Sequence, residues 1–178
     1  MKTKQMVLTA LLLAMCIVFQ SMKGISVYLT GSAVNALLVM ATLSVGMSSG
    51  VFIAVITPII AYLMGHTPVM QMIPLMVIVV MVGNLALVLM AGKGRKGNLP
   101  TWLAAGAVLK AVVLWLLVWY AVLPFFGGAV PEKMVAVIKT TFSITQLITA
   151  AIGCVIAYII HLRVQHMYFA DTKKADKR

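Results

Sequence analysis

Long apolar segments, separated only by short loops, restrict the fold of this chain more than any other feature of its sequence. Hydrophobic residues make up 63% of the 178 residues and charged residues only 10%, whereas a soluble domain carries about 25% charged residues. These charges are too few to cover a surface that faces water. The segments also lack the alternation of apolar and polar residues that marks the strands of a membrane β-barrel. The sequence therefore predicts an all-α membrane protein.

The spacing of the loops predicts six transmembrane helices in one compact bundle, which forms a single domain. A helix that crosses a bilayer needs about 20 residues. The predicted spans are residues 6–22, 33–46, 51–64, 69–91, 100–122 and 133–162, followed by a basic tail at 163–178. The second and third spans are short, so Gly46, Gly50 and Pro58 mark either two full spans or a re-entrant hairpin packed inside the protein.

The distribution of lysine and arginine predicts the orientation, because cytoplasmic loops carry an excess of both. With six spans, both termini and the loop after the fourth span share one side. That side holds Lys2, Lys4, Lys93, Arg95, Lys96, Arg163, Lys173, Lys174, Lys177 and Arg178, and the other side holds Lys23, Lys133 and Lys139. We therefore predict cytoplasmic termini and a multi-pass protein of the bacterial inner (plasma) membrane. The net charge of +11 does not indicate nucleic acid, because the basic residues lie at helix ends and in the tail.

Lys110 is the residue that most strongly indicates a binding site. It lies about ten residues into the fifth predicted span, roughly 15 Å deep at about 1.5 Å per residue. An ionisable side chain at that depth suggests a function; the alternative is a lysine that reaches the surface because its helix starts later or tilts. No Asp or Glu lies in any predicted span, so Lys110 would suit an anionic group of a ligand, such as a carboxylate.

The sixth predicted span begins with a polar stripe. Lys139, Ser143 and Gln146 follow the i, i+4, i+7 spacing of one helical face. Such a stripe either lines a ligand cavity or forms hydrogen bonds with a neighbouring helix.

Three further side chains are candidates for ligand contact. Trp115 lies deeper than the interfacial aromatic belt requires, so it either anchors the helix or stacks on a ligand. Asn84 is an amide inside the fourth span that needs a partner, which is either another helix or a ligand. Asn35 lies with Thr30 and Ser32 where the first loop meets the second span, where these residues either cap the helix or close over a site.

We expect no metal site, no cofactor and no enzymatic activity. His66, His161 and His166 lie in loops or at span ends without metal-ligand spacing. Cys16 and Cys154 are single thiols with apolar neighbours, typical of small residues in a core or facing lipid. The chain contains neither an HExxH motif nor a nucleophile–base constellation.

Several local features together resemble a known family. Ala10 and Ala14 form a small-xxx-small pair, which allows close helix approach. The segment Ala10-Leu-Leu-Leu-Ala14 resembles the AxxxA element of the substrate-binding S components of energy-coupling factor (ECF) transporters. The glycine and proline positions are also similar to that family over nearly the whole chain: Gly31-Ser32-Ala33-Val34-Asn35, Pro58, Gly65, Pro68, Pro74 and Gly83-Asn84.

The resemblance implies a mechanism and partners. An S component binds a vitamin-like micronutrient with its first loop and the outer halves of its later helices. It then docks through its AxxxA element on a transmembrane coupling subunit that carries two ATPase subunits, and topples to deliver the substrate inward. This chain has no phosphate-binding loop, so a partner would hydrolyse ATP. Lys110 and Lys139 favour an anionic substrate, with pantothenate, niacin and folate as examples.

Two other functions remain as alternatives at this point. A stand-alone secondary transporter or small channel often carries membrane carboxylates for proton or sodium coupling, and the predicted spans contain none. A membrane accessory or assembly protein without a ligand would not depend on Lys110 or Gln146.

Overall fold

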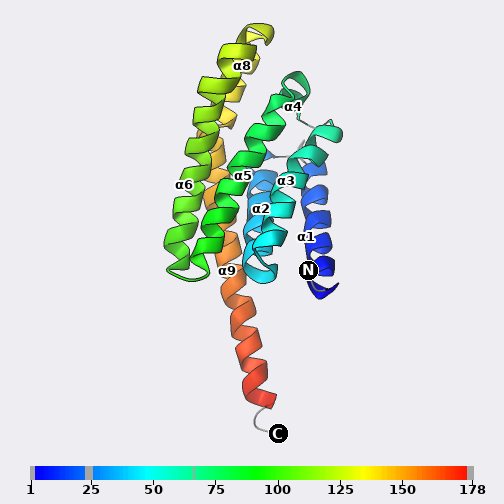
Figure 1. Ribbon diagram of the computed structural model, residues 1–178, viewed down its shortest axis with the longest axis vertical. Helices are drawn as coiled ribbons and strands as arrows, with labels where there is room; N and C mark the ends of the chain where they lie inside the picture. The colour runs from blue at the N-terminus through cyan, green and yellow to red at the C-terminus, as the bar shows by residue number, and fades with distance from the viewer. Residues whose placement is uncertain (1–2, 23–25, 66, 176–178) are drawn as a thin grey trace.

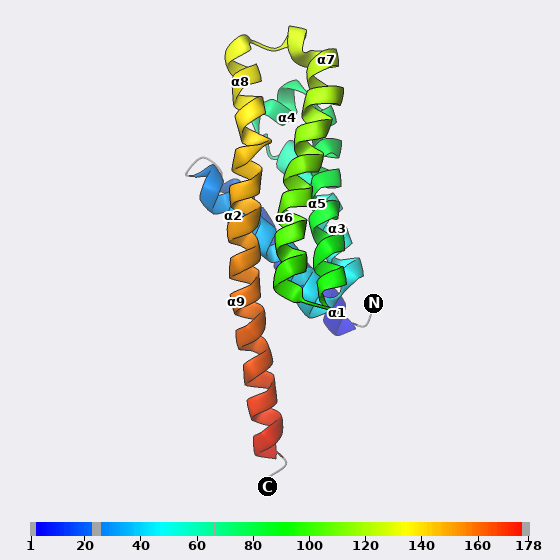
Figure 2. The ribbon, with the colours of Figure 1, turned by 90° about the vertical axis from the view of Figure 1, so that its left-hand side faces the viewer.

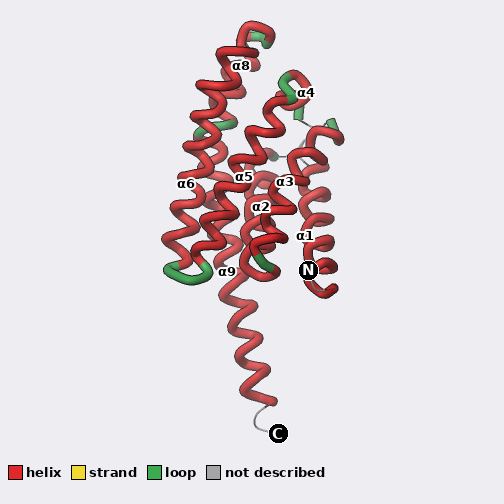
Figure 3. Tube along the Cα trace, in the orientation of Figure 1, coloured by secondary structure: helices red, strands yellow, loops and turns green. Residues whose placement is uncertain are grey.

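The computed structural model describes residues 3–22, 26–65 and 67–175, and helices joined by short loops account for all of them (Figure 3). The prediction of an all-α protein is confirmed for this part of the chain. Five residues used or considered above lie outside the described residues: Lys2, Lys23, His66, Lys177 and Arg178.

The helices follow one another with few intervening residues (Figure 1). Two of them end in a wider π-helical turn, a feature that often lies near functional sites. In chain order the elements are α1 (Thr3–Ser21), α2 (Val27–Met40), the π-helix η1 (Ala41–Val45), α3 (Met47–Leu63), α4 (Pro68–Met72), α5 (Leu75–Gly94), α6 (Leu99–Leu117), the π-helix η2 (Val118–Val122), α7 (Leu123–Phe126), the 3₁₀-helix η3 (Gly127–Ala129), α8 (Glu132–Thr141) and α9 (Ile144–Ala175).

Five helical segments of the described chain are long and apolar enough to cross a membrane. They are Thr3–Ser21, Val27–Val45, Leu75–Gly94, Leu99–Phe126 and Glu132–Val164. The third predicted span corresponds to α3, which has 17 residues and so lies at the lower end of the usual range of about 17–25. A sixth crossing by α3 stays a prediction.

The second helix begins earlier than the sequence suggested, at Val27 rather than at residue 33. Ser26 starts it, because its side-chain Oγ accepts a hydrogen bond from the backbone N–H of Leu29 at 3.3 Å. Thr30 and Asn35 therefore lie inside α2, and Asn35 does not cap it. The start of α2 was predicted too late because, in the sequence, polar residues on a buried helix look the same as those of a polar loop.

Two predicted spans contain a break, and the tail continues a helix. Pro74 separates α4 from α5, because proline has no N–H to continue the helical hydrogen bonds. Phe142 and Ser143 separate α8 from α9. Finally, α9 runs on to Ala175, through most of the predicted tail, and extends beyond the bundle (Figure 1); lysine, arginine, alanine and glutamine in this stretch favour helix.

A single residue, Gly46, separates the π-helix η1 from α3. Its φ of +147° is a conformation that residues with a side chain rarely adopt. The two helices then cross closely: a Cβ on Gly50 would lie 2.1 Å from Oγ1 of Thr42. Residues 47–50, which lie between the second and third predicted spans, form the first turn of α3.

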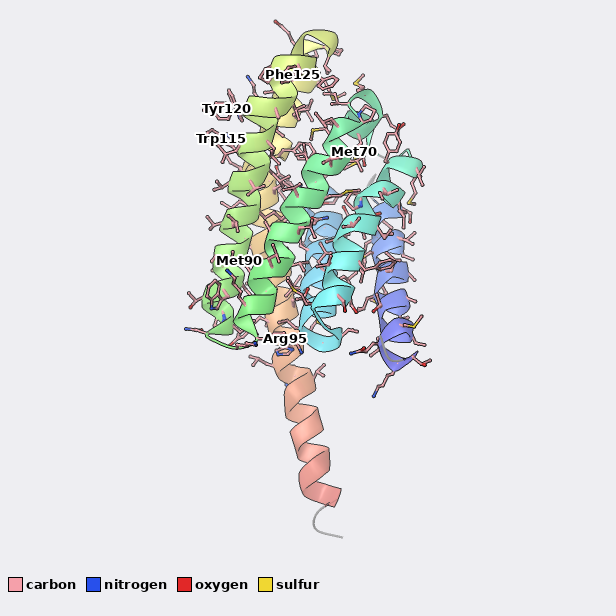
Figure 4. The ribbon with its side chains drawn as sticks, in the orientation of Figure 1. Met70, Met90, Arg95, Trp115, Tyr120 and Phe125 are labelled. Atoms are coloured by element: carbon pink, nitrogen blue, oxygen red, sulfur yellow. The ribbon has the colours of Figure 1, made fainter. Side chains whose placement is uncertain are left out.

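The helices form a bundle in which α5 packs on α6 and α2 on α9 (Figure 2), while α1 packs at the edge against α2 and α3. The chain enters α1 and leaves α9 at the same end of the bundle (Figure 1). Figure 4 places Arg95 at that end as well. The helices α4, α7 and α8 lie toward the opposite end. This arrangement fits an even number of crossings.

Cysteine labelling should determine which end faces the cytoplasm. We predict that Gly128→Cys, in η3, reacts with a membrane-impermeant maleimide on intact cells, because the positive-inside rule places the α7–α8 end outside. Lys96→Cys, in the α5–α6 loop, should react only after lysis. The parental chain is the control, since Cys16 and Cys154 are both buried. The reverse labelling pattern would contradict the orientation.

Candidate functional site

Lys110 lies in the middle of α6 and is held by two asparagine side chains. Its Nζ donates hydrogen bonds to Oδ1 of Asn35, at 2.6 Å, and to Oδ1 of Asn84, at 2.8 Å. All three side chains are buried, with 3–4% of their surface exposed. The amide oxygens replace part of the water shell that an ammonium group loses on burial, but they carry no charge to balance it.

A proline in α3 explains the orientation of Asn84. Pro58 lacks the N–H that would bond to the carbonyl of Ala54, four residues earlier, so that carbonyl is available. The Nδ2 group of Asn84 donates to it in a long hydrogen bond of 3.5 Å. Because a carbonyl only accepts, the amide nitrogen must face α3, and the amide oxygen then faces Lys110.

Asn35 is oriented from the other side, by α9. Its Nδ2 donates to Oγ1 of Thr149 at 3.5 Å, and Thr149 Oγ1 donates to the carbonyl of Gln146. The helices α2 and α9 approach closely here because Gly153 has no side chain: a Cβ on it would lie 2.6 Å from the Cβ of Asn35 and 2.7 Å from the carbonyl oxygen of Ser32. Lys110 thus joins α2, α3, α5, α6 and α9.

A cavity of about 350 Å³ lies beside this lysine. Residues of α1 to α6, α8 and α9 line it, and Lys110, Asn35 and Asn84 form a polar cluster in a lining that also includes Gln20 and Gln146. The volume is at the lower end of the range of about 300–1,000 Å³ typical of small-molecule sites. Val27 and Val137 also line it and are about half exposed, so the cavity reaches the surface between the start of α2 and α8.

Charge and hydrogen-bonding capacity are unevenly distributed in this cavity. Lys110 is the only charged residue among the described residues that line it. Most of the other lining residues are apolar. Gln20 of α1 is an exception: it is buried, its Nε2 donates to the carbonyl of Thr57 at 3.2 Å, and its Oε1 has no hydrogen-bond partner within the described chain.

The seven side chains proposed from the sequence as substrate contacts fall into two groups. Lys110, Asn35, Asn84 and Gln146 line the cavity. The other three, Lys139, Ser143 and Trp115, lie outside its lining.

Lys139, Ser143 and Trp115 are not among the residues that line the cavity. The ammonium of Lys139 lies 4.6 Å from the ring centroid of Trp119, and Ser143 Oγ donates to the carbonyl of Lys139 at 2.6 Å. Trp115 is 40% exposed and packs against Trp119 and Tyr120; Figure 4 shows Trp115 and Tyr120 pointing outward from the bundle. A role for these three residues in binding stays a prediction.

Sequence reasoning missed several lining residues. Gln20, Thr57, Met70 and Phe142 all line the cavity. A signal existed for Gln20, an amide near the end of an otherwise apolar span, as there was for Asn84. None existed for Met70 or Phe142, because apolar residues at a cavity look like any other core residue in a sequence.

The described part of the chain contains no group of three or more His, Cys, Asp or Glu residues that could hold a metal ion. Cys154 Sγ, in α9, lies 3.6 Å from the carbonyl oxygen of Leu103, in α6. This contact packs α9 against α6.

The fold and the cavity define a multi-helix membrane protein with room for one small solute. A family model described as the substrate-specific component of ECF transporters matches residues 4–164. The chain belongs to this family, and the resemblance drawn from the sequence is confirmed. It is therefore a substrate-binding subunit of ECF transport, an integral membrane protein from a family of binding proteins rather than enzymes. No curated protein and no solved structure matches the chain.

The lysine and its two asparagines should show strong energetic coupling. We predict that Asn84→Leu lowers the free energy of unfolding by about 1–3 kcal/mol, because it leaves a buried ammonium with one acceptor fewer. In a Lys110→Met background the same substitution should cost less, because only the long bond to the Ala54 carbonyl is then lost. Thermal unfolding of the four purified proteins in detergent gives the coupling. Additive costs would show that the lysine does not depend on Asn84.

Proposed function

We propose that this chain is the S subunit of an ECF importer that captures an anionic, vitamin-like solute from the extracellular side. The observation that carries this proposal is the Lys110 ammonium, buried beside a solute-sized cavity whose described lining contains no carboxylate. Asn35 and Asn84 solvate the ammonium without neutralising it. An anionic ligand group would supply the missing counter-charge in a low-dielectric site, where it is worth most.

The position of the cavity supports capture from outside. Residues of α4 and α8 line it, and both helices lie toward the end of the bundle opposite the termini and Arg95 (Figures 1 and 4). The positive-inside rule assigns the end with the termini to the cytoplasm. The cavity would then lie in the extracellular half of a bacterial plasma membrane protein, where a solute arriving from outside can reach it.

The position of α1 supports docking on a coupling subunit. This helix lies at the edge of the bundle, and only 17% of its apolar window is buried. Thr9 and Cys16 face the bundle, whereas Ala10 and Ala14 lie on the exposed face. Small side chains there leave room for close approach by a helix of another subunit. We propose that this face binds the transmembrane coupling subunit, whose ATPases drive the toppling that delivers the solute inward.

Bulky side chains on this face should block assembly without affecting solute capture. We predict that the double variant Ala10→Trp, Ala14→Trp no longer co-purifies with the coupling subunit and ATPases, and loses ATP-dependent uptake in proteoliposomes. The small molecule that co-purifies with the isolated subunit should be retained. The matched control is Val112→Trp on the exposed face of α6, which should assemble normally.

Three outcomes would count against the proposal. Assembly that survives both tryptophans would remove the docking role of α1. Uptake by the chain without any ATPase, abolished by collapse of the ion gradient, would favour a secondary transporter. A protein that keeps its role in the cell without binding any solute would instead be an accessory protein.

A further inference from the structure

We infer that the cavity accepts a small monocarboxylate with a mainly aliphatic body that carries a hydroxyl or amide N–H donor near the carboxylate. This inference rests on the proposed function, because it specifies the substrate class of the same site. Four features of the site lead to it: its charge, an unpaired acceptor, the spacing between the two, and the lining.

The charge of the site balances one negative charge. Lys110 is the only charged residue among the described residues that line the cavity. A second carboxylate or a phosphate dianion would bring a further charge into a low-dielectric region without a partner, which is strongly unfavourable. An ammonium also has three N–H donors, and Asn35 and Asn84 accept two of them. One donor remains for a ligand oxygen.

Gln20 requires a donor from the ligand. Its Nε2 faces the carbonyl of Thr57, and a carbonyl only accepts, so the orientation of the amide is fixed. Its Oε1 therefore points elsewhere, and that atom is buried and unpaired in the described structure. Gln20 lines the same cavity as Lys110. A buried acceptor without a partner is destabilising, and a ligand O–H or N–H would offset that cost.

Both polar points of the site are linked to α3. Asn84, which holds Lys110, is bonded to the carbonyl of Ala54, and Gln20 is bonded to the carbonyl of Thr57. These two carbonyls are three residues apart, a rise of about 4.5 Å along an α-helix. We therefore expect the ligand donor to be displaced from the carboxylate toward the end of α3 that leads to α4.

The remaining lining selects the ligand body. Apolar side chains such as Val34, Val80 and Met70 form most of it, and Phe142 is the only aromatic residue among its described members. A fused ring system would lack the pair of aromatic faces that usually holds one. The volume of about 350 Å³ lies at the lower end of the range typical of small-molecule sites, which limits the ligand to a small molecule.

Three anionic probes separate these requirements in a binding titration on the full chain in nanodiscs. Pantothenate is an aliphatic monocarboxylate with hydroxyl and amide donors, hexanoate is one without a donor, and folate is a dicarboxylate with a fused ring. We expect pantothenate to bind at least tenfold more tightly than hexanoate, and folate not to compete. Lys110→Met should abolish binding of both monocarboxylates, whereas Lys133→Met, at an exposed lysine of α8, should not.

The donor requirement is tested with Gln20→Leu, which should remove the preference for pantothenate over hexanoate. The matched control is Gln71→Leu, at an exposed glutamine of α4 outside the cavity lining, which should keep it. Equal binding of pantothenate and hexanoate by the wild type, tighter binding of folate, or no effect of Gln20→Leu would overturn the inference.

The inference and the proposed function can fail separately. If no probe binds but the chain supports ATP-dependent uptake of another solute with its ECF partners, the substrate class is wrong and the proposed function stands. If pantothenate binds as expected but its uptake needs no ATPase, the site assignment stands and the proposed function is wrong.

Discussion

The hydrogen bonds from Lys110 to Asn35 and Asn84 are the interaction on which the rest of the site depends. They allow an ammonium group to lie near the middle of a membrane bundle, at a depth where an unsolvated charge is strongly disfavoured. Both acceptors are neutral, so they do not balance the charge of a protonated Lys110. The cluster differs in this from an ion pair that serves only to hold helices together.

Backbone features at and beside the cavity fix this geometry. Pro58 frees a carbonyl that orients Asn84, and Gly153 lets α9 approach the helix that carries Asn35. Because each amide nitrogen bonds to an adjacent helix, both amide oxygens must face the lysine. The same lysine connects five helices, and through Asn84 it is linked to α3, on which α1 packs.

Composition and loop spacing were enough to predict the helical membrane fold. Polar residues stand out in apolar spans, and this singled out Lys110, Asn35, Asn84 and Gln146, which line the cavity. The start of α2 was missed because polar residues on a buried helix face resemble a loop. The resemblance implied a site formed by the first loop and the outer halves of the later helices, whereas residues of α1 to α5 supply most of the described lining. The rotation of each helix about its axis and the angles at which helices cross decide which polar residues meet. Helices that are apolar on nearly every face give no periodic signal from which the rotation or the crossing angles could be predicted.

Mass spectrometry of small molecules extracted from the purified protein tests the role of Lys110 most directly. Wild-type protein, Lys110→Met and Lys133→Met would be prepared in parallel from the same cells. The account predicts one enriched anionic solute in the wild type and in Lys133→Met, present near stoichiometric amounts, and its loss from Lys110→Met while that variant remains folded. An equal amount of the same anion in folded Lys110→Met, or a solute without a negative charge in the wild type, would contradict it.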